Sequence, residues 1–130
     1  MNKSLRQEHY KGAANEHAAA SWFLKRGFIV CWPFPQQSCI DFVVLKDKKF
    51  STVQVKIATW SKTGNNKYLQ CRTRLTNKYQ NIKPSDLYDL MFIVCGNDCW
   101  IIPSEHIESS NISLSGKQNK WDIYKSKIVD

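Results

Sequence analysis

Short motifs that mark common catalytic sites are missing from this sequence. Its 130 residues contain no Walker A phosphate loop, no G-x-G-x-x-G turn, no serine-nucleophile elbow and no H-E-x-x-H helix. These absences argue against a P-loop nucleotidase, a dinucleotide-dependent enzyme, a serine hydrolase of the α/β type and a zincin protease. The five cysteines form no C-x-x-C pair, and Cys95 and Cys99 lack the second pair that a zinc site needs.

Long apolar runs are missing as well. The run Leu90–Cys95 is among the longest, and it is far too short to span a bilayer. No apolar segment follows the initial Met-Asn-Lys-Ser, so we expect no secretory signal peptide. Together with an odd number of cysteines, this predicts reduced thiols in a cytoplasmic protein. With 42% hydrophobic residues an ordered core is expected, and the length suits a single domain over residues 1–130.

Acidic residues are scarce in the middle of the chain. Between Lys46 and Lys83 ten basic residues stand against one acidic residue, Asp47, so this segment carries +9 while the rest carries −1. A solvated surface would account for exposed lysines, but it does not require them to be concentrated in one segment. Binding to a phosphate backbone favours such concentration, because each neutralised phosphate releases counterions. The net charge of +8 therefore indicates a nucleic acid partner.

The order of elements predicts an α/β fold in which helices flank a mixed β-sheet. A capping box at Ser4 begins a helix that runs to Arg26 and ends at Gly27. A polar loop is expected over 58–67 and a short helical turn over 103–105. Strands are expected at residues 28–32, 39–45, 50–57, 68–75, 90–95 and 99–102.

Three polar residues interrupt otherwise apolar strands. Asp41 lies within one strand, and Gln54 and Lys56 lie two residues apart in the next, so these two side chains share a face. An unpaired buried carboxylate is costly, and a hairpin between the strands can bring Asp41 beside the other two. Carboxylate and amide oxygens suit Mg²⁺, and a lysine can stabilise developing negative charge. The alternative is a solvated strand face without chemistry.

With Glu16 on the preceding helix, these residues resemble the PD-(D/E)XK nuclease superfamily in its Holliday junction resolvase-like branch. The Gln54-Val55-Lys56 sequence resembles most closely the intron-encoded homing endonucleases that use this fold. The resemblance continues through the helix segment 12–20 and the later segments 90–103 and 120–122. It implies a restriction-endonuclease-like core.

The resemblance also implies roles for these positions. Asp41 would be the principal metal ligand, with Gln54, the main-chain carbonyl of Val55 and the Glu16 carboxylate as further ligands. Lys56 would be the catalytic lysine, and Glu16, Asp41, Gln54 and Lys56 together would form the catalytic set. The cofactor would be Mg²⁺, with Mn²⁺ as a possible substitute. Gln54 is neutral where relatives more often have a carboxylate, so a weakened nuclease that acts as a nucleic-acid-binding regulator is an alternative.

We therefore expect a metal-dependent endonuclease that hydrolyses double-stranded DNA at a specific site. A structure-specific nuclease for branched DNA is the close alternative, since both need phosphate contacts and differ in base readout. A chain this small contacts a long target more easily as a homodimer or homotetramer, and we expect a bacterial or phage-encoded protein. The residues expected to contact DNA are Lys62, Lys67, Arg72, Arg74 and Lys78.

Overall fold

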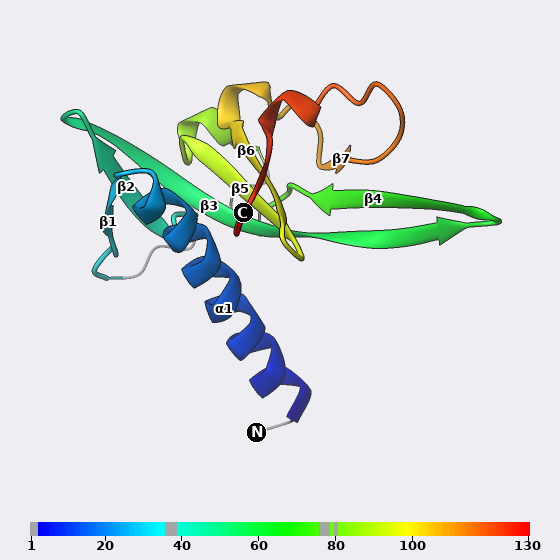
Figure 1. The fold of residues 1–130 in the computed structure, drawn as a ribbon, viewed down its shortest axis with the longest axis horizontal. Helices are drawn as coiled ribbons and strands as arrows, with labels where there is room; N and C mark the ends of the chain where they lie inside the picture. Colours follow the sequence, from blue (N-terminus) through cyan, green and yellow to red (C-terminus); the bar gives the residue numbers. More distant parts are fainter. Residues whose placement is uncertain (1–2, 36–38, 76–78, 80) are drawn as a thin grey trace.

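The computed structural model describes residues 3–35, 39–75, 79 and 81–130. One long helix, α1, precedes eight strands that form a mixed sheet (Figure 1). Helix α1 spans Lys3–Lys25 and the strands are β1 (Ile29–Cys31), β2 (Phe42–Lys46), β3 (Lys49–Thr63), β4 (Asn66–Arg72), β5 (Leu90–Cys95), β6 (Asp98–Pro103), β7 (Asn111–Ser113) and β8 (Lys125–Lys127). Single 3-10 turns occur at Pro84–Asp86, Ser104–His106 and Asp122–Tyr124.

Helix α1 ends where the sequence predicts. Gly27 adopts a left-handed φ of +85°, and its N–H donates to the carbonyl of Leu24 at 3.1 Å while the N–H of Phe28 donates to Phe23, also at 3.1 Å. This pair of bonds is a Schellman motif, which left-handed glycine permits. The rings of Phe23 and Phe28 meet edge to face at 5.1 Å, so the motif also brings the first strand back onto the helix.

Strand β3 is the organising strand of the sheet. It pairs antiparallel with β2 through residues 49–53, parallel with β5 through residues 53–57, and antiparallel with β4 from Ala58 onward. The sheet order is β1-β2-β3-β5-β6-β8, with β4 on β3 and β7 on β4. In Figure 1 the β3–β4 hairpin projects well beyond the rest of the sheet. We call residues 58–72 the hairpin arm.

The predicted loop over 58–67 is wrong, because these residues extend two paired strands. Thr63 pairs with Asn66, so the turn is the two residues Gly64 and Asn65. Gly64 has a φ of +62°, as the first central residue of a tight hairpin turn often requires. Arg74 also lies beyond β4, which ends at Arg72, although the sequence suggested a strand to residue 75. The short strand β7 had no sequence signal strong enough to predict it.

Two cores lie on opposite faces of the sheet, and β5 contributes to both. Met91 and Ile93 belong to one core, which also contains Trp100 and residues of the C-terminal segment. Phe92 and Val94 belong to the other, which is closed by Ala19, Ala20 and Phe23 of α1. Alternation with a period of two explains this division. Because both faces of β5 are buried, its sequence is continuously apolar.

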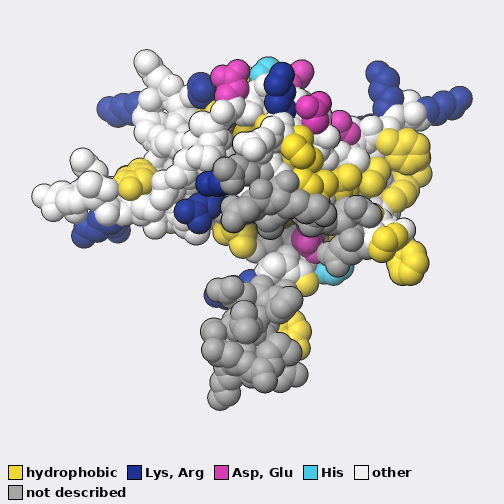
Figure 2. Space-filling view, turned by 180° about the vertical axis from the view of Figure 1, so that it is seen from behind, with side chains coloured by type: hydrophobic (Ala, Val, Ile, Leu, Met, Phe, Trp, Pro, Cys, Tyr) yellow, Lys and Arg dark blue, Asp and Glu magenta, His cyan; other side chains and the backbone are white. Residues whose placement is uncertain are grey.

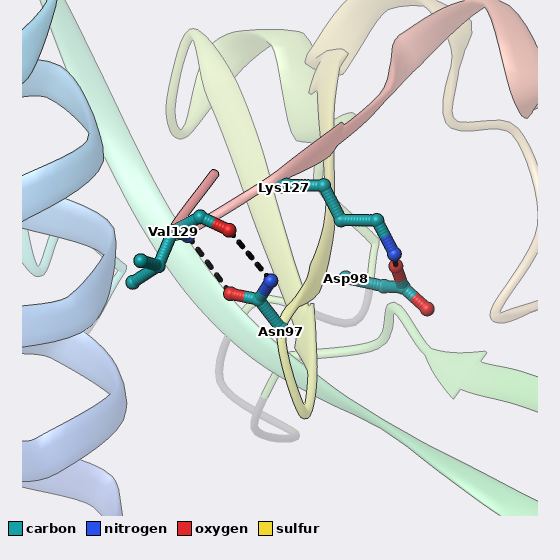
Figure 3. Close-up of polar contacts among 4 residues, drawn as sticks. All are labelled: Asn97, Asp98, Lys127 and Val129. Atoms are coloured by element: carbon teal, nitrogen blue, oxygen red, sulfur yellow. Dashed lines mark hydrogen bonds and ion pairs between the residues drawn. The ribbon is translucent and has the colours of Figure 1, made fainter.

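The C-terminal segment is fixed to the β5–β6 turn by polar contacts (Figure 3). The Asn97 side chain donates to the carbonyl of Val129 at 2.7 Å and accepts from its N–H at 2.8 Å. Lys127 forms an ion pair with Asp98, the residue directly opposite it in the β6–β8 strand pair. These bonds hold β8 against β6. No helix among the described residues is long and apolar enough to cross a membrane.

We predict that Phe23→Ala destabilises the protein by about 3–5 kcal/mol, as removal of a fully buried aromatic ring usually does. Phe23 is 1% exposed and its ring lies near those of Trp22, Phe42 and Phe92. Its neighbour Leu24 is 57% exposed, so Leu24→Ala should change the free energy of unfolding by less than about 1 kcal/mol. Urea denaturation of both variants tests this, and equal losses would contradict the assignment of Phe23 to the core.

Candidate active site

Asp41 is fixed at the point where β2 begins to pair with β3. Its N–H donates to the carbonyl of Val53 at 2.8 Å, and its carboxylate oxygen Oδ2 accepts from the N–H of Val55 at 2.6 Å. The carboxylate thus takes the place of a main-chain acceptor just before β2 begins. A charge-assisted bond of this kind is short and strong. The prediction that a hairpin brings Asp41 beside the Gln54–Lys56 segment is confirmed.

Glu16 reaches the same position from α1. Burial, then a hydrogen bond to Asp41 and the negative charge of Asp41, raise the pKa of the Glu16 carboxyl from 4.5 to about 7. Two carboxyl groups this close cannot both ionise without cost, so the Glu16 carboxyl is still partly protonated near neutral pH. The helix carboxylate and the strand carboxylate therefore form a pair, as the resemblance implies.

Gln54 is buried beside this carboxyl pair, with only 7% of its surface exposed. Its Nε2 donates to the carbonyl of Val55 at 3.4 Å, but its Oε1 is buried and has no hydrogen-bond partner among the described residues. An unpaired buried acceptor costs about 1–3 kcal/mol. Such an atom needs a water or an ion as partner.

Lys56 shares its sheet face with Gln54 and is partly buried. Burial lowers the pKa of the Lys56 ammonium, while Cys71 and Asp41 act against that shift. Burial also raises the pKa of the Cys71 thiol to about 12, so this thiol is neutral near pH 7 and Asp41 is the effective counter-charge. The ammonium donates to the carbonyl of Arg74 at 3.3 Å, which turns it toward the base of the hairpin arm.

The donor set at this point fits a hard divalent cation. Two carboxylates, the unpaired Oε1 of Gln54 and the main-chain carbonyl of Val55 are all oxygen donors, which Mg²⁺ prefers. Within the described part of the chain, no group of three or more His, Cys, Asp or Glu side chains could hold a metal. A metal here would therefore depend on the neutral Gln54 and Val55 oxygens as well as on Glu16 and Asp41.

The predicted DNA-contacting residues are spread over the hairpin arm and its base. Lys62 and Lys67 stand directly opposite each other near the tip, and both are exposed. Arg72 ends β4, and Arg74 follows it; both are also exposed. Lys78 lies outside the described residues. Figure 2 shows Lys and Arg side chains on the projecting arm.

One polar contact at the site escaped the sequence analysis. Asp89, just before β5, accepts through Oδ2 from the Thr52 N–H at 2.8 Å and from the Thr52 hydroxyl at 3.2 Å. The N–H of Asp89 donates back to the Thr52 hydroxyl at 2.9 Å. These three hydrogen bonds fix the start of β5 against β3. They therefore fix the register of the strand that carries Gln54 and Lys56. No sequence signal links positions 37 residues apart.

Residues 6–126 match the PD-(D/E)XK endonuclease family. The chain belongs to the PD-(D/E)XK endonuclease family. This membership confirms the superfamily resemblance and makes the protein a nuclease by family.

Two further similarities to known proteins extend over nearly the whole chain. Protein 5.3 of Escherichia phage T7 is 34% identical over 116 residues, which cover 89% of this chain and 97% of that protein. The solved structure of a bacterial homing endonuclease, I-Ssp6803I, superposes with a TM-score of 0.70 at 18% identity, over 90% of this chain and 86% of that one. The second likeness confirms the predicted α/β, restriction-endonuclease-like fold.

We predict that the metal-free PD-(D/E)XK protein loses stability as pH rises from about 4.5 to about 7. The pKa of Glu16 is 4.5 when unperturbed and about 7 in the fold, so the folded state binds more protons in this window and is favoured at its acidic end. Glu16→Gln should remove this part of the pH dependence, measured as Tm against pH in EDTA. Glu108→Gln, at an exposed carboxylate, should leave the profile unchanged. Identical profiles for wild type and Glu16→Gln would contradict the pairing with Asp41.

Proposed function

We propose that this protein is a Mg²⁺-dependent endodeoxyribonuclease that cuts double-stranded DNA, at a specific site in the manner of a homing enzyme. The observation that carries the proposal is the juxtaposition of the Glu16–Asp41 carboxyl pair with the unpaired Oε1 of Gln54. These groups occur in a chain of the PD-(D/E)XK endonuclease family. A cytoplasmic location and a bacterial or phage origin remain predictions from the sequence.

In this proposal, Glu16, Asp41, Gln54 and the Val55 carbonyl hold the cation. Mg²⁺ at such a site supplies charge stabilisation at a phosphate and lowers the pKa of a bound water; Mn²⁺ is a plausible substitute because it also prefers oxygen donors. The protein keeps Asp41 in one orientation through the Val55 N–H, at 2.6 Å. Pre-orientation of this kind avoids reorganisation during the reaction.

Lys56 is the proposed catalytic cation. Its ammonium is partly withdrawn from water and, within the described part of the chain, makes one hydrogen bond, to the Arg74 carbonyl. The two remaining N–H donors can therefore contact a phosphate oxygen as negative charge develops on it. A charge acts more strongly where water is excluded, so the partial burial that lowers the pKa of Lys56 also strengthens this contact.

The hairpin arm is the proposed DNA-binding element. A two-stranded β-ribbon fits the major groove, and the arm carries Lys62 and Lys67 as a directly opposed pair. Like charges across a strand pair repel, and a phosphate near both lysines relieves that repulsion. Arg72 and Arg74 lie closer to the candidate active site, where they would contact the groove or the backbone. Lys78 remains a sequence prediction for a backbone contact.

We predict that Asp41→Asn lowers nicking of supercoiled plasmid in Mg²⁺ by at least ~100-fold, a loss typical of removing one charge-stabilising group. Asparagine keeps an oxygen that can accept from the Val55 N–H, so the fold should persist. Lys56→Met should lose activity to a similar degree. Asp86→Asn and Lys117→Met change exposed residues of the same types and should nick like wild type. Equal nicking by Asp41→Asn and wild type would contradict the catalytic assignment.

We predict that Lys67→Ala weakens DNA binding and reduces the slope of log K against log salt by about 0.9, the contribution of one phosphate contact. Fluorescence anisotropy of a labelled duplex in EDTA measures this without cleavage. Lys117→Ala, at an exposed lysine outside the arm, should leave the slope unchanged. An unchanged slope for Lys67→Ala would remove the arm tip from the DNA-binding surface.

A second candidate function is DNA binding without cleavage. It is favoured by one observation: among the described residues, the site has no third carboxylate beside Glu16 and Asp41, because the neutral Gln54 stands where the family resemblance more often implies one. A wild-type protein that binds duplex with a steep salt dependence but nicks no plasmid in Mg²⁺ or Mn²⁺ would establish this function. Comparison of linear with four-way branched DNA then separates site-specific from structure-specific recognition.

A further inference from the structure

The segment that follows β1 presents aromatic side chains to solvent. Phe34 is 100% exposed and Trp32 is 49% exposed, with Pro33 between them. We call residues 32–34 the aromatic loop. A phenyl ring that is entirely exposed forgoes the stabilisation that burial of an aromatic side chain provides. Among the large hydrophobic side chains that the structure describes, none is more exposed than Phe34, so this ring is available to a partner molecule.

The base of the aromatic loop is anchored, whereas its tip faces solvent. The Trp32 ring lies 5.4 Å from the ring of Phe42 and 5.4 Å from the ring of His17, measured between ring centroids. Phe42 is fully buried in the core that α1 closes, so Trp32 rests on a well-packed support. These contacts fix the point at which the loop leaves the sheet.

The two rings that hold Trp32 belong to neighbours of the acidic residues. His17 follows Glu16 on α1, and Phe42 follows Asp41 at the start of β2. The aromatic loop therefore borders the Glu16–Asp41 carboxyl pair. In Figure 1, β1 and the hairpin arm lie at opposite ends of the sheet, so contacts from the aromatic loop and from the arm would fall on opposite sides of the site.

The chemistry of the aromatic loop fits the bases of DNA better than its phosphates. Residues 32–34 offer no cation, whereas phosphate contacts come chiefly from charged and polar donors. Aromatic rings stack on any base, and proteins that kink DNA insert apolar side chains such as Phe between base steps. The loop covers a small part of the roughly 800 Å² that each partner buries in a standard protein interface, but one ring is enough to enter a base step.

We infer that Phe34 is a wedge that enters the base stack of DNA beside the phosphate held at the carboxyl pair, with Trp32 as its support. The inference rests on the proposed function, because it needs a phosphate of DNA at Glu16 and Asp41. Successive phosphates of one strand are about 3.4 Å apart along the duplex axis, so the base steps that flank the held phosphate are near a loop that borders the site. The ligand is DNA whose bases are locally unstacked.

A wedge makes recognition depend on how easily the base stack opens. Unstacking costs least at a mismatched or damaged base, and pyrimidine–purine steps open more readily than A-tracts. We therefore expect the protein to prefer a duplex whose stacking is interrupted at one position. Such a preference needs no hydrogen bond to a base edge, so it would operate both at a fixed cutting site and at a branch point.

The test measures binding in EDTA, so that no cleavage intervenes. Fluorescence anisotropy compares a fully paired duplex with the same duplex carrying one central mismatch, and 2-aminopurine beside the mismatch reports unstacking as a rise in fluorescence. Wild type should bind the mismatched duplex at least ~5-fold more tightly, the lower end of the effect of one stacked base. Phe34→Ala should bring the affinity ratio to about 1 and abolish the fluorescence rise. Phe34→Leu keeps an apolar wedge and should retain part of both.

The matched control is Phe50→Ala. Phe50 is 66% exposed and lies near the β2–β3 turn, paired with Leu45, so its removal should leave the affinity ratio and the fluorescence rise as in wild type. Circular dichroism and Tm verify that each variant is folded. A wild type that does not prefer the mismatched duplex, or a folded Phe34→Ala that keeps the preference, would overturn the inference. Equal loss of the preference in Phe50→Ala would also overturn it.

The outcomes also separate this inference from the proposed function. A wild type that nicks plasmid in Mg²⁺ but binds both duplexes equally would overturn the wedge alone. A wild type that binds no duplex would overturn the proposed function and the wedge with it. Sedimentation velocity of Phe34→Ala tests a protein partner at the loop: if the variant alters the self-association of the chain but not the affinity ratio, Phe34 contacts protein and the inference is wrong.

Discussion

The hydrogen bond from the Val55 N–H to the Asp41 carboxylate, at 2.6 Å, is the contact on which the arrangement of the site depends. Strand β2 begins to pair at Phe42, and β3 then passes to β5. At that junction β2 offers no main-chain acceptor to the N–H of Val55. A side-chain carboxylate serves it, and the same group is presented to Glu16. The constraint is one of hydrogen-bond satisfaction, and the acidic pair follows from it.

The electrostatics of the site arise from partial burial of unlike groups. The pKa of Glu16 is raised to about 7 because burial and Asp41 both disfavour its charged form. Burial also lowers the pKa of the Lys56 ammonium below that of an exposed lysine. Gln54 contributes an oxygen without adding charge. The site thus carries less negative charge than its number of oxygen donors suggests.

Local patterns in the sequence predicted α1, the hairpins and the neighbours Asp41, Gln54 and Lys56. Gly27 was readable because a left-handed helix end favours glycine. The hairpin arm could not be predicted, because residues 58–67 are polar on both sides of Gly64 and have the composition of a loop. Strand pairing holds its outer part, whereas Leu69 and Cys71 near its base are alternate residues buried in one of the two cores. The Asp89–Thr52 contact joins distant parts of the chain, and only the folded register brings them together.

The length of β3 sets a distance scale for the whole molecule. One strand carries Lys56 at the site and Lys62 near the arm tip. A strand rises about 3.3 Å per residue, so Lys56 and Lys62 are separated by roughly 20 Å. Duplex DNA advances about 3.4 Å per base pair, which makes this separation equal to about six base pairs. Because β3 is one continuous strand, it fixes the distance between the proposed DNA contact at Lys62 and the candidate active site at Lys56.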